Sequence, residues 1–179
     1  VYKRQGQFAI AAGTGVISTT GTALDYEPAT SHTLTVSVSD GSNAVTNTVV
    51  ITVTDANDQT PTFSATAGAI NYAEGATTAV DSFTITDTDT SGTLACAEGG
   101  ADASKFSCAI SGSTLTVSWD ASPDFETQTD ADSNGVYVYT ITVGDGTNNA
   151  NAVTYTITVT DVVIDISAAS ATIDETASN

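Results

Sequence analysis

Basic residues are almost absent from the sequence. It contains 3 lysines and arginines against 21 aspartates and glutamates, so the formal net charge is −18. Binding to nucleic acid needs a basic surface that meets the phosphates, and this composition excludes it. The excess of carboxylates leaves two interpretations, which are general solubility and the binding of hard cations such as calcium. The positions of the carboxylates decide between them.

Long apolar segments are missing as well. A membrane-spanning helix needs roughly 18 apolar residues in a row, and the longest apolar runs here are short, as in Val49-Val50-Ile51. Methionine is absent, and the helix-forming residues lysine, arginine, leucine and glutamine are scarce. Threonine, valine, serine, glycine and aspartate dominate instead, a composition typical of strands joined by turns. We therefore expect an all-β protein with no segment inserted directly in a membrane.

The first five residues differ from the remainder of the chain. Residues 1–5 hold two of the three basic residues. We interpret them as an adapter scar rather than as part of a fold. Because the initial methionine is also missing, we expect the chain to be a piece of a longer protein.

A repeat of about one hundred residues organises the rest of the sequence. The paired segments are 32–43 with 137–148, 49–55 with 155–161, 24–27 with 123–126, and 69–74 with 171–175. One insertion, residues 127–135, changes the spacing between the copies. The repeat predicts similar domains in tandem rather than one large domain.

Each copy alternates apolar and hydroxyl-bearing residues. Leu34, Val36 and Val38 fall on one face of their strand, and Thr33 and Thr35 fall on the other. This pattern is typical of a two-sheet sandwich whose outer faces meet water. Seven strands are expected in the middle of the chain, near 68–74, 79–87, 93–98, 105–110, 113–119, 136–144 and 152–161. Seven strands in about one hundred residues are the size of an immunoglobulin-like sandwich.

These patterns divide the chain into three parts. Residues 1–57 are expected to form the C-terminal half of a first repeat. Residues 58–161 form a complete repeat, and residues 162–179 form the opening strand of a third. Since half a sandwich lacks the strands that cover its core, we expect the first part to be less stable than the second.

Acidic motifs follow one another in a fixed order. They are Leu24-Asp25-Tyr26-Glu27, Asp40-Gly41, the run DANDQTPTF from Asp55 to Phe63, and Asp87-Thr88-Asp89. In order and spacing they resemble the calcium signature of cadherin repeats. The resemblance covers nearly the whole chain after residue 5. It is strongest to the cadherin-like arrays of large bacterial surface adhesins, in which segments such as Pro123–Glu126 and Gly100–Ala103 recur.

The resemblance implies tandem cadherin-like Greek-key β-sandwiches on a cell surface, with Ca²⁺ at the junctions between repeats. Calcium takes about six to eight oxygen ligands, which two domains and their linker can supply together. At the first junction the implied ligands are Asp25, Glu27, Asp55, Asn57, Asp58, the Gln59 carbonyl, Asp87, Asp89 and Asp145. Bound calcium would neutralise these carboxylates and join neighbouring repeats.

The second junction departs from the family pattern. Residues 161–165 read DVVID, without the Asn-Asp pair and the proline of the first linker. The implied ligands are Glu74, Asp124, Glu126 and Asp161, and the remainder of this site would lie in a third repeat. Ser91-Gly92-Thr93 also lacks the asparagine that the family places after Asp-x-Asp. We therefore expect one well-formed site and one partial site.

The loop from Asp130 to Gly135 has two interpretations. It reads DADSNG, the first half of a helical-hand calcium loop, but Ile141 stands where that loop needs a glutamate and a strand follows instead of a helix. The loop could hold a cation locally. It could instead be a tight turn in which Asn134 and Gly135 adopt positive φ.

Cys96 and Cys108 are the only cysteines, and both fall at apolar positions of their strands. An even number of cysteines in an extracellular sandwich favours a disulfide. The alternative is a pair of buried free thiols.

Function follows from these features. We expect an extracellular, calcium-binding adhesion module, not an enzyme, whose partners are neighbouring repeats and surface proteins or glycans. The alternative is a carbohydrate- or ice-binding sandwich, supported by the threonines of residues 154–160, although threonine also suits any exposed sheet face. Asp124 and Glu126 could be read as a hydrolytic pair, but the pair recurs in both copies. His32 and Trp119 are expected to pack rather than to act chemically.

Overall fold

The computed structural model describes residues 6–163, which are almost entirely strands and loops. Residues 1–5 and 164–179, which include the adapter scar and most of the third repeat expected from the sequence, lie outside the described residues. The described chain forms two compact units. The first contains 6–63, 85–95 and 143–150, and the second contains 64–84, 96–142 and 151–163. No described helix is long and apolar enough to cross a membrane.

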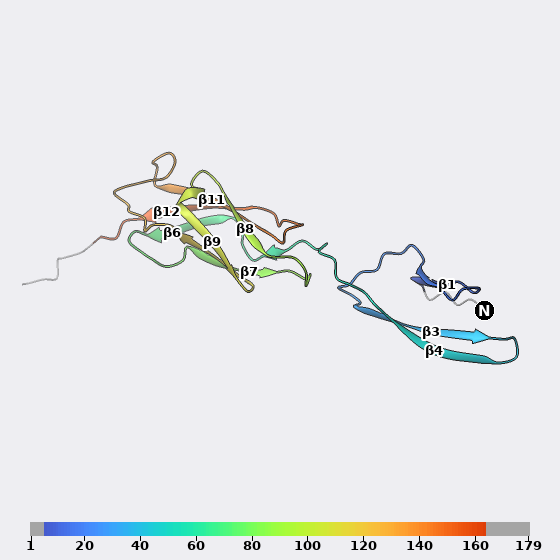
Figure 1. The fold of residues 1–179 in the computed structure, drawn as a ribbon. Helices are drawn as coiled ribbons and strands as arrows, with labels where there is room; N and C mark the ends of the chain where they lie inside the picture. Colours follow the sequence, from blue (N-terminus) through green and yellow to red (C-terminus); the bar gives the residue numbers. More distant parts are fainter. Residues whose placement is uncertain (1–5, 164–179) are drawn as a thin grey trace, which may run out of the picture. The chain divides into compact units, whose positions relative to one another are not determined.

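Two short antiparallel pairs make up most of the first unit (Figure 1). Strand β1 (Phe8–Ile10) pairs with β2 (Ile17–Thr19), and β3 (Ser31–Ser39) pairs with β4 (Ala44–Thr52). The β3–β4 turn forms because the Asp40 carboxylate accepts hydrogen bonds from the backbone N–H groups of Ser42 and Asn43. Phe8 and Leu34 are buried here.

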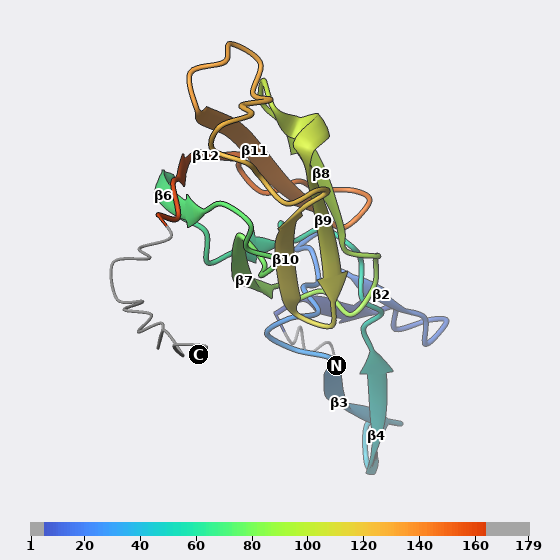
Figure 2. The ribbon, with the colours of Figure 1, turned by 90° about the vertical axis from the view of Figure 1, so that its left-hand side faces the viewer.

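Two four-stranded sheets form the sandwich, which contains the seven predicted strands and one short strand at residues 62–63 that was not predicted (Figure 2). The first has the order β5 (Thr62–Phe63), β7 (Asp81–Thr86), β10 (Thr114–Trp119), β9 (Phe106–Ser111). The second has the order β6 (Gly68–Ala73), β12 (Val153–Thr160), β11 (Val136–Gly144), β8 (Ala95–Gly99). A 3-10 turn, η1 (Ala103–Lys105), precedes β9. The predicted all-β class is confirmed, and the ends of the seven predicted strands are correct to within two residues.

The apolar residues at alternate positions along the strands fill the sandwich core. Leu115, Tyr139 and Ile141 are fully buried, and their polar neighbours along each strand face outward. An aromatic group surrounds Trp119, whose ring centroid lies 4.2 Å from Phe106 and 4.8 Å from Tyr137. Stacking of this kind adds to the free energy of burial. These residues give the second unit an apolar core.

The disulfide that the sequence favours is present. Cys96 of β8 and Cys108 of β9 are joined, with a Cα–Cα distance of 6.4 Å. Because β8 belongs to one sheet and β9 to the other, this bond links the two layers of the sandwich covalently.

Candidate metal centre

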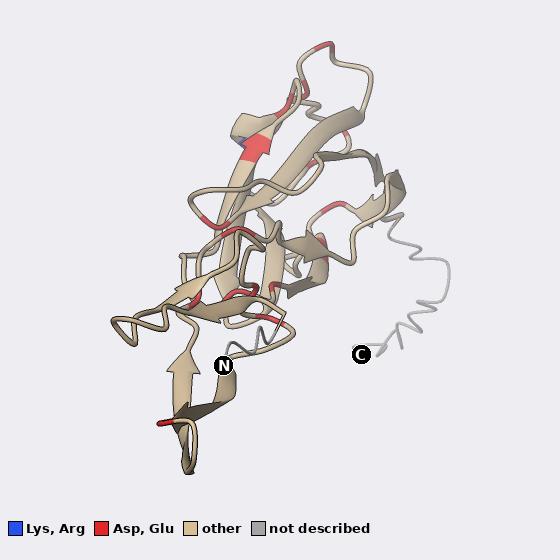
Figure 3. Ribbon diagram, turned by 90° about the vertical axis from the view of Figure 1, so that its right-hand side faces the viewer, with Lys and Arg blue, Asp and Glu red and all other residues tan. Residues whose placement is uncertain are grey.

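Acidic residues gather in the loops of the structure. Of those described, only Asp81 and Glu98 lie within strands, and Figure 3 shows the remainder in the connections. Three groups of carboxylates bring possible ligand atoms within 4.8 Å of one another. The groups are Glu27 with Asp58 and Asp89, Asp87 with Asp89 and Asp145, and Glu74 with Asp124 and Glu126. Asp89 is shared by the first two groups.

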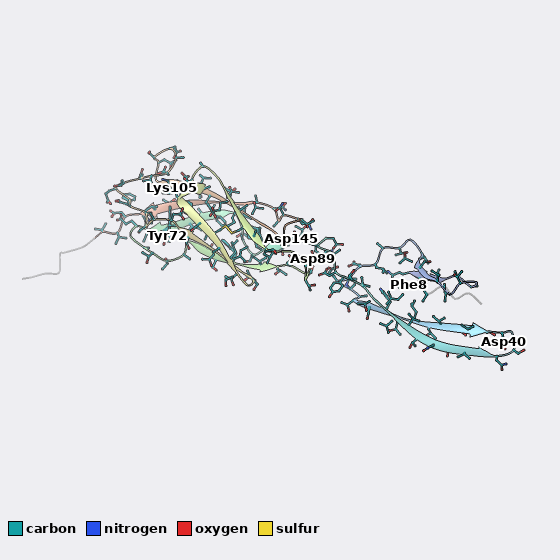
Figure 4. All side chains as sticks on the ribbon, in the orientation of Figure 1. Phe8, Asp40, Tyr72, Asp89, Lys105 and Asp145 are labelled. Atoms are coloured by element: carbon teal, nitrogen blue, oxygen red, sulfur yellow. A yellow bond between two sulfur atoms is a disulfide. The ribbon has the colours of Figure 1, made fainter. Side chains whose placement is uncertain are left out.

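The first two groups come from four segments of the first unit. We call these two groups, together with Asp25, Asp55, Asn57 and Gln59, the first-junction site. These segments are the turn before β3, the connection after β4, the connection between β7 and β8, and the turn after β11. Figure 4 shows Asp89 and Asp145 next to each other. Segments far apart in the sequence thus meet at this site.

One oxygen of each central carboxylate is held by backbone N–H groups. Asp89 Oδ2 accepts a hydrogen bond from the Gln59 N–H at 2.9 Å. Asp145 Oδ1 accepts from the Thr147 and Asn148 N–H groups, both at 2.7 Å. Asp55 Oδ2 accepts from the Thr90 N–H at 2.6 Å and from Ser91. These bonds fix the orientation of the carboxylates.

The other oxygen of each of these carboxylates is buried and meets no donor among the described residues. The carboxylate and amide oxygens of this kind at the site are Glu27 Oε1, Asp55 Oδ1, Asn57 Oδ1, Asp89 Oδ1 and Asp145 Oδ2. A buried polar atom without a partner destabilises a fold by about 1–3 kcal/mol, and more when it is charged. Oxygen atoms from carboxylates and an amide are the ligands that calcium prefers. The residues present therefore fit a calcium ion.

Asn57 holds two of the four segments together. Its side-chain Nδ2 donates to the Asp145 carbonyl at 3.3 Å, which leaves Oδ1 free as a ligand. Gly92 lies against this contact with φ of +94°, and a Cβ there would lie 2.6 Å from Asn57 Nδ2. Only glycine fits this position without displacing Asn57.

The predicted Gln59 carbonyl already has one partner. It accepts a hydrogen bond from Asn148 Nδ2 at 2.9 Å, and the Gln59 side chain donates to Asp58 Oδ1 at 2.8 Å. A carbonyl oxygen has two lone pairs, so this bond orients the Gln59 oxygen without removing it as a ligand. Asp25 is exposed and belongs to neither group, but it meets Glu27.

Crowding of the acids shifts their pKa values. A hydrogen bond with the Asp25 carboxyl, together with partial burial and the nearby Asp89, raises the pKa of Glu27 to about 7. The Thr90 hydroxyl lowers the pKa of Asp55, and the Asn148 N–H lowers that of Asp145. Asp55 and Asp145 are therefore held in their ionised form, and Glu27 takes up a proton near neutrality.

Three residues of the site were not identified from the sequence. Ser91 Oγ is buried with no partner and lies next to Asp55. The Asn148 side chain donates a hydrogen bond to the Gln59 carbonyl, and Gly92, which has no side chain, leaves room for the Asn57 side chain. The repeat contained a signal for Asn148, because Asn43 stands at the same place in the first copy. Ser91 and Gly92 carried no comparable signal.

The third group, Glu74 with Asp124 and Glu126, lies at the second junction and differs from the first-junction site in its hydrogen bonds. Both Glu74 oxygens accept backbone hydrogen bonds, from Phe125 at 2.9 Å and Val162 at 2.8 Å. The Val162 N–H lowers the pKa of Glu74. The backbone N–H of Glu126 itself lowers its pKa, but some loss of hydration and the charges of Glu74 and Asp161 raise it overall. Among the described residues this group has no buried oxygen without a donor, unlike the first-junction site.

The loop from Asp130 to Gly135 is organised by its own backbone. The Asp130 carboxylate accepts hydrogen bonds from Asn134 N–H at 2.7 Å and Gly135 N–H at 3.3 Å. Gly135 has positive φ as expected, but Ser133 rather than Asn134 is the other residue with positive φ, so that part of the prediction was wrong. The buried Asp102 carboxylate fastens the loop to β11 through the N–H groups of Ala131 and Val138. These bonds support the tight-turn interpretation.

The remaining candidates serve packing. Trp119 contacts Phe106 and Tyr137, and the His32 ring centroid lies 5.2 Å from that of Phe8. Thr140 and Thr154 bond to each other through their hydroxyl groups at 2.8 Å.

No protein-family model and no curated protein sequence matches the chain. Solved structures do match it. A protocadherin gammaB7 EC3-6 cis-dimer is 25% identical, with a TM-score of 0.67 over 90% of this chain and 40% of that chain. The protocadherin GammaB4 extracellular domain is 26% identical, with a TM-score of 0.68 over 90% of this chain and 26% of that one. The human desmocollin-1 ectodomain is 20% identical, with a TM-score of 0.67 over 89% of this chain and 32% of that one.

The chain therefore has a cadherin-like fold, that of extracellular adhesion domains. It spans less than half the length of each of these three structures.

Proposed function

We propose that this chain is a calcium-binding spacer of a multi-repeat adhesin on a cell surface, bacterial as the sequence resemblance implies. Ca²⁺ would bind at the first-junction site and stiffen the connection between the first repeat, residues 1–57, and the complete repeat, residues 58–161. Its partners would be neighbouring repeats and surface proteins or glycans.

The single observation that carries the proposal is the set of five buried oxygens without donors. Three of these oxygens belong to Asp55, Asp89 and Asp145, whose opposite oxygen is held by backbone N–H groups, so these carboxylates cannot turn away from one another without breaking those bonds. Like charges at this separation repel. A divalent cation is the species that satisfies both the missing partners and the charge.

The distribution of ligands supports a mechanical role. Glu27 comes from the first repeat, Asn57 and Asp58 from the connecting segment, and Asp89 and Asp145 from loops of the complete repeat. A metal bound by all of them would tie these segments together. Asp124 and Glu126 occupy the positions that Asp25 and Glu27 hold in the first copy. This recurrence favours a structural role for the pair over a catalytic one. It also supports a second, partial calcium site at the other junction.

The extracellular location has two further supports. The similar solved structures are ectodomains, and the Cys96–Cys108 disulfide is of the kind that persists in oxidising compartments.

Thermal melts of the chain in calcium, in magnesium and in chelator test the proposal. We expect calcium to raise the melting temperature, because a ligand at 100 times its dissociation constant adds about 2.7 kcal/mol. Magnesium should have a smaller effect, since it requires a tighter octahedral shell. Coincident curves in calcium and chelator would contradict the proposal.

A further inference from the structure

A cavity of about 400 Å³ lies in the second unit. Its lining comes from η1, from the end of β10, from the connection between β10 and β11, and from the beginning of β11. Cavities that bind small molecules have volumes of about 300–1,000 Å³, with a few polar groups that fix the ligand. The polar groups of this cavity therefore indicate what it could hold.

Trp119 brings an unpaired hydrogen-bond donor to the cavity. Its ring packs against Phe106 and Tyr137, but its buried indole N–H has no acceptor among the described residues. Buried tryptophans usually find a partner for this group, and a donor left without one destabilises the fold. An acceptor on a bound ligand would complete the bond.

Lys105 brings a second donor group to the same cavity. It is the only lysine or arginine among the described residues, and it immediately precedes β9 (Figure 4). Its ammonium group forms no ion pair within the described part of the chain, although the net charge of the chain is −18. An ammonium group offers three N–H donors and no acceptor. The cavity thus combines two donor groups that the protein itself does not satisfy.

Hydroxyl groups supply further polar positions in the lining. Tyr137 Oη accepts a hydrogen bond from the Thr129 N–H at 3.1 Å, and Ser122 Oγ donates to the Ala76 carbonyl at 3.2 Å. A hydroxyl group can donate one bond and accept two, so each keeps capacity for a ligand. A ligand that matches this lining must donate and accept at several positions, as the hydroxyl groups of a sugar do.

The charge of the cavity favours a neutral ligand. Asp120 and Asp124 also line it, and two carboxylates against the one ammonium group of Lys105 give a formal charge of −1. An anion would in addition be repelled by the −18 charge of the whole chain. Acidic sugars are therefore disfavoured relative to neutral ones.

We propose that this cavity binds a neutral hexose unit of a glycan, with the Trp119 N–H and the Lys105 ammonium group donating to its oxygens. The adhesive purpose of this contact rests on the proposed function, in which glycans are among the partners. The cavity itself shares no residue with the first-junction site, so sugar binding does not require calcium there.

Titration of the full chain with the methyl glycosides of glucose, galactose, mannose and N-acetylglucosamine tests the proposal. Because Trp119 is the only tryptophan in the sequence, its fluorescence reports on the cavity directly. We expect at least one glycoside to change the emission saturably, and saturation-transfer NMR to show the same sugar in contact with the protein. The response should persist in chelator. Glucuronate, which adds a carboxylate, should bind at least about tenfold more weakly than the best neutral sugar.

Variants of the lining locate the sugar. Lys105→Ala removes a charged donor and should weaken binding at least about fivefold, whereas Lys3→Ala makes the same charge change outside the cavity and should leave binding unchanged. Ala121→Phe should abolish binding because its ring would fill the cavity, and it should leave the melting temperature close to that of the wild type because Ala121 is exposed. Trp119 stays unchanged in all variants, since its ring belongs to the core.

Four results would overturn the proposal. Absence of any response to the four glycosides means that the cavity takes no neutral hexose. Binding that is unchanged in both Lys105→Ala and Ala121→Phe places the sugar elsewhere. Tighter binding of glucuronate contradicts the choice of a neutral ligand, and loss of binding in chelator replaces direct recognition by a contact through a metal. Sugar binding in a chain whose melting temperature does not respond to calcium would uphold the cavity and contradict the calcium site alone.

Discussion

At the scale of single residues, Asp89 has the most central position in the first-junction site. It is the one carboxylate common to both first-unit groups, and its Oδ2 is already bonded to the Gln59 N–H while Oδ1 has no partner. An asparagine at this place would retain the shape and remove the charge. The effect of such a change on calcium affinity separates a metal site from a set of polar loop contacts.

We expect Asp89→Asn to weaken calcium binding at least about tenfold, or roughly 1.4 kcal/mol, because one of the few charged ligands is lost. Titration calorimetry measures this directly. Asp120→Asn is the control, since Asp120 is exposed and belongs to none of the three carboxylate groups. Equal affinities for the two variants would show that Asp89 is not a ligand.

Gly92 provides a second test that leaves every carboxylate intact. Gly92→Ala should lower both stability and calcium affinity, because its Cβ would lie 2.6 Å from Asn57 Nδ2 and 2.9 Å from the Asp145 carbonyl. Gly41→Ala introduces similar backbone strain at φ of +100°, but with no atom near its Cβ. The strain alone destabilises by roughly 1–2 kcal/mol. We expect calcium affinity to fall in Gly92→Ala and not in Gly41→Ala. Equal calcium affinities of the two variants would mean that the position of Asn57 does not matter for calcium binding.

The raised pKa of Glu27 predicts that stability and calcium affinity depend on pH. Its pKa is raised from 4.5 to about 7, so in the metal-free protein the bound proton contributes stability that is complete below pH 4.5 and lost as the pH rises through 7. Calcium requires the ionised carboxylate, so its affinity should rise over the same interval. Calcium titrations at several pH values between 5 and 8 measure this trend.

Glu27→Gln should flatten the trend, and Glu126→Gln at the other junction should leave it unchanged. A pH dependence that is identical in all three proteins would assign the proton to another group.

At the scale of elements, the two hairpins with the same pattern have different surroundings. Strands β11 and β12 lie in a covered sandwich, where Tyr139 and Ile157 are almost fully buried, whereas β3 and β4 leave Val38 and Val45 exposed. Burial of apolar surface is the main source of stability. The complete repeat should therefore carry most of the stability of the chain.

The disulfide belongs to this scale because it joins β8 and β9 from opposite sheets. Replacing both Cys96 and Cys108 by alanine should lower the free energy of unfolding by about 3 kcal/mol, as expected for a short closed loop. Denaturant unfolding of the variant measures the change, and mass spectrometry of alkylated wild type should find no free thiol. Two alkylated cysteines in the oxidised protein would contradict the bridge.

At the scale of the whole molecule, calcium should act on the connection between repeats rather than on the sandwich core. The proposed ligands lie in loops, and the core comes from the strands themselves. We expect chelator to broaden the distribution of distances seen by small-angle scattering while the β-sheet signal of circular dichroism persists. Asp58→Ala should reproduce the effect of chelator, because the connecting segment loses the carboxylate that lies with Glu27 and Asp89.

Unchanged scattering in calcium, in chelator and in Asp58→Ala would contradict the stiffening role. Loss of all folded signal in chelator would place the metal in the fold of the repeat itself.

The sequence by itself determined the seven strands between residues 68 and 161, but not β1, β2, β5 or the order of the strands in each sheet. Alternation along 136–144 and 153–160 depends only on which side chains are apolar, and the repeat of Asp-Phe-Glu and Asp-Gly motifs marks equivalent positions without any coordinates. The disulfide could be favoured for the same reason, since both cysteines were in phase with apolar neighbours.

Tertiary structure decided which oxygens are free. Whether a carboxylate in a loop bonds to a backbone N–H or remains available depends on loop conformation, which local sequence does not fix. Asp130 and Asp89 both lie in motifs rich in aspartate, yet Asp130 closes its own turn whereas Asp89 Oδ1 stays without a donor. Ser91 and Gly92 acquired their roles only because the chain brings Asp55 and Asn57 against them from more than thirty residues away. Such contacts follow from packing between distant segments, and pattern along the chain cannot supply them.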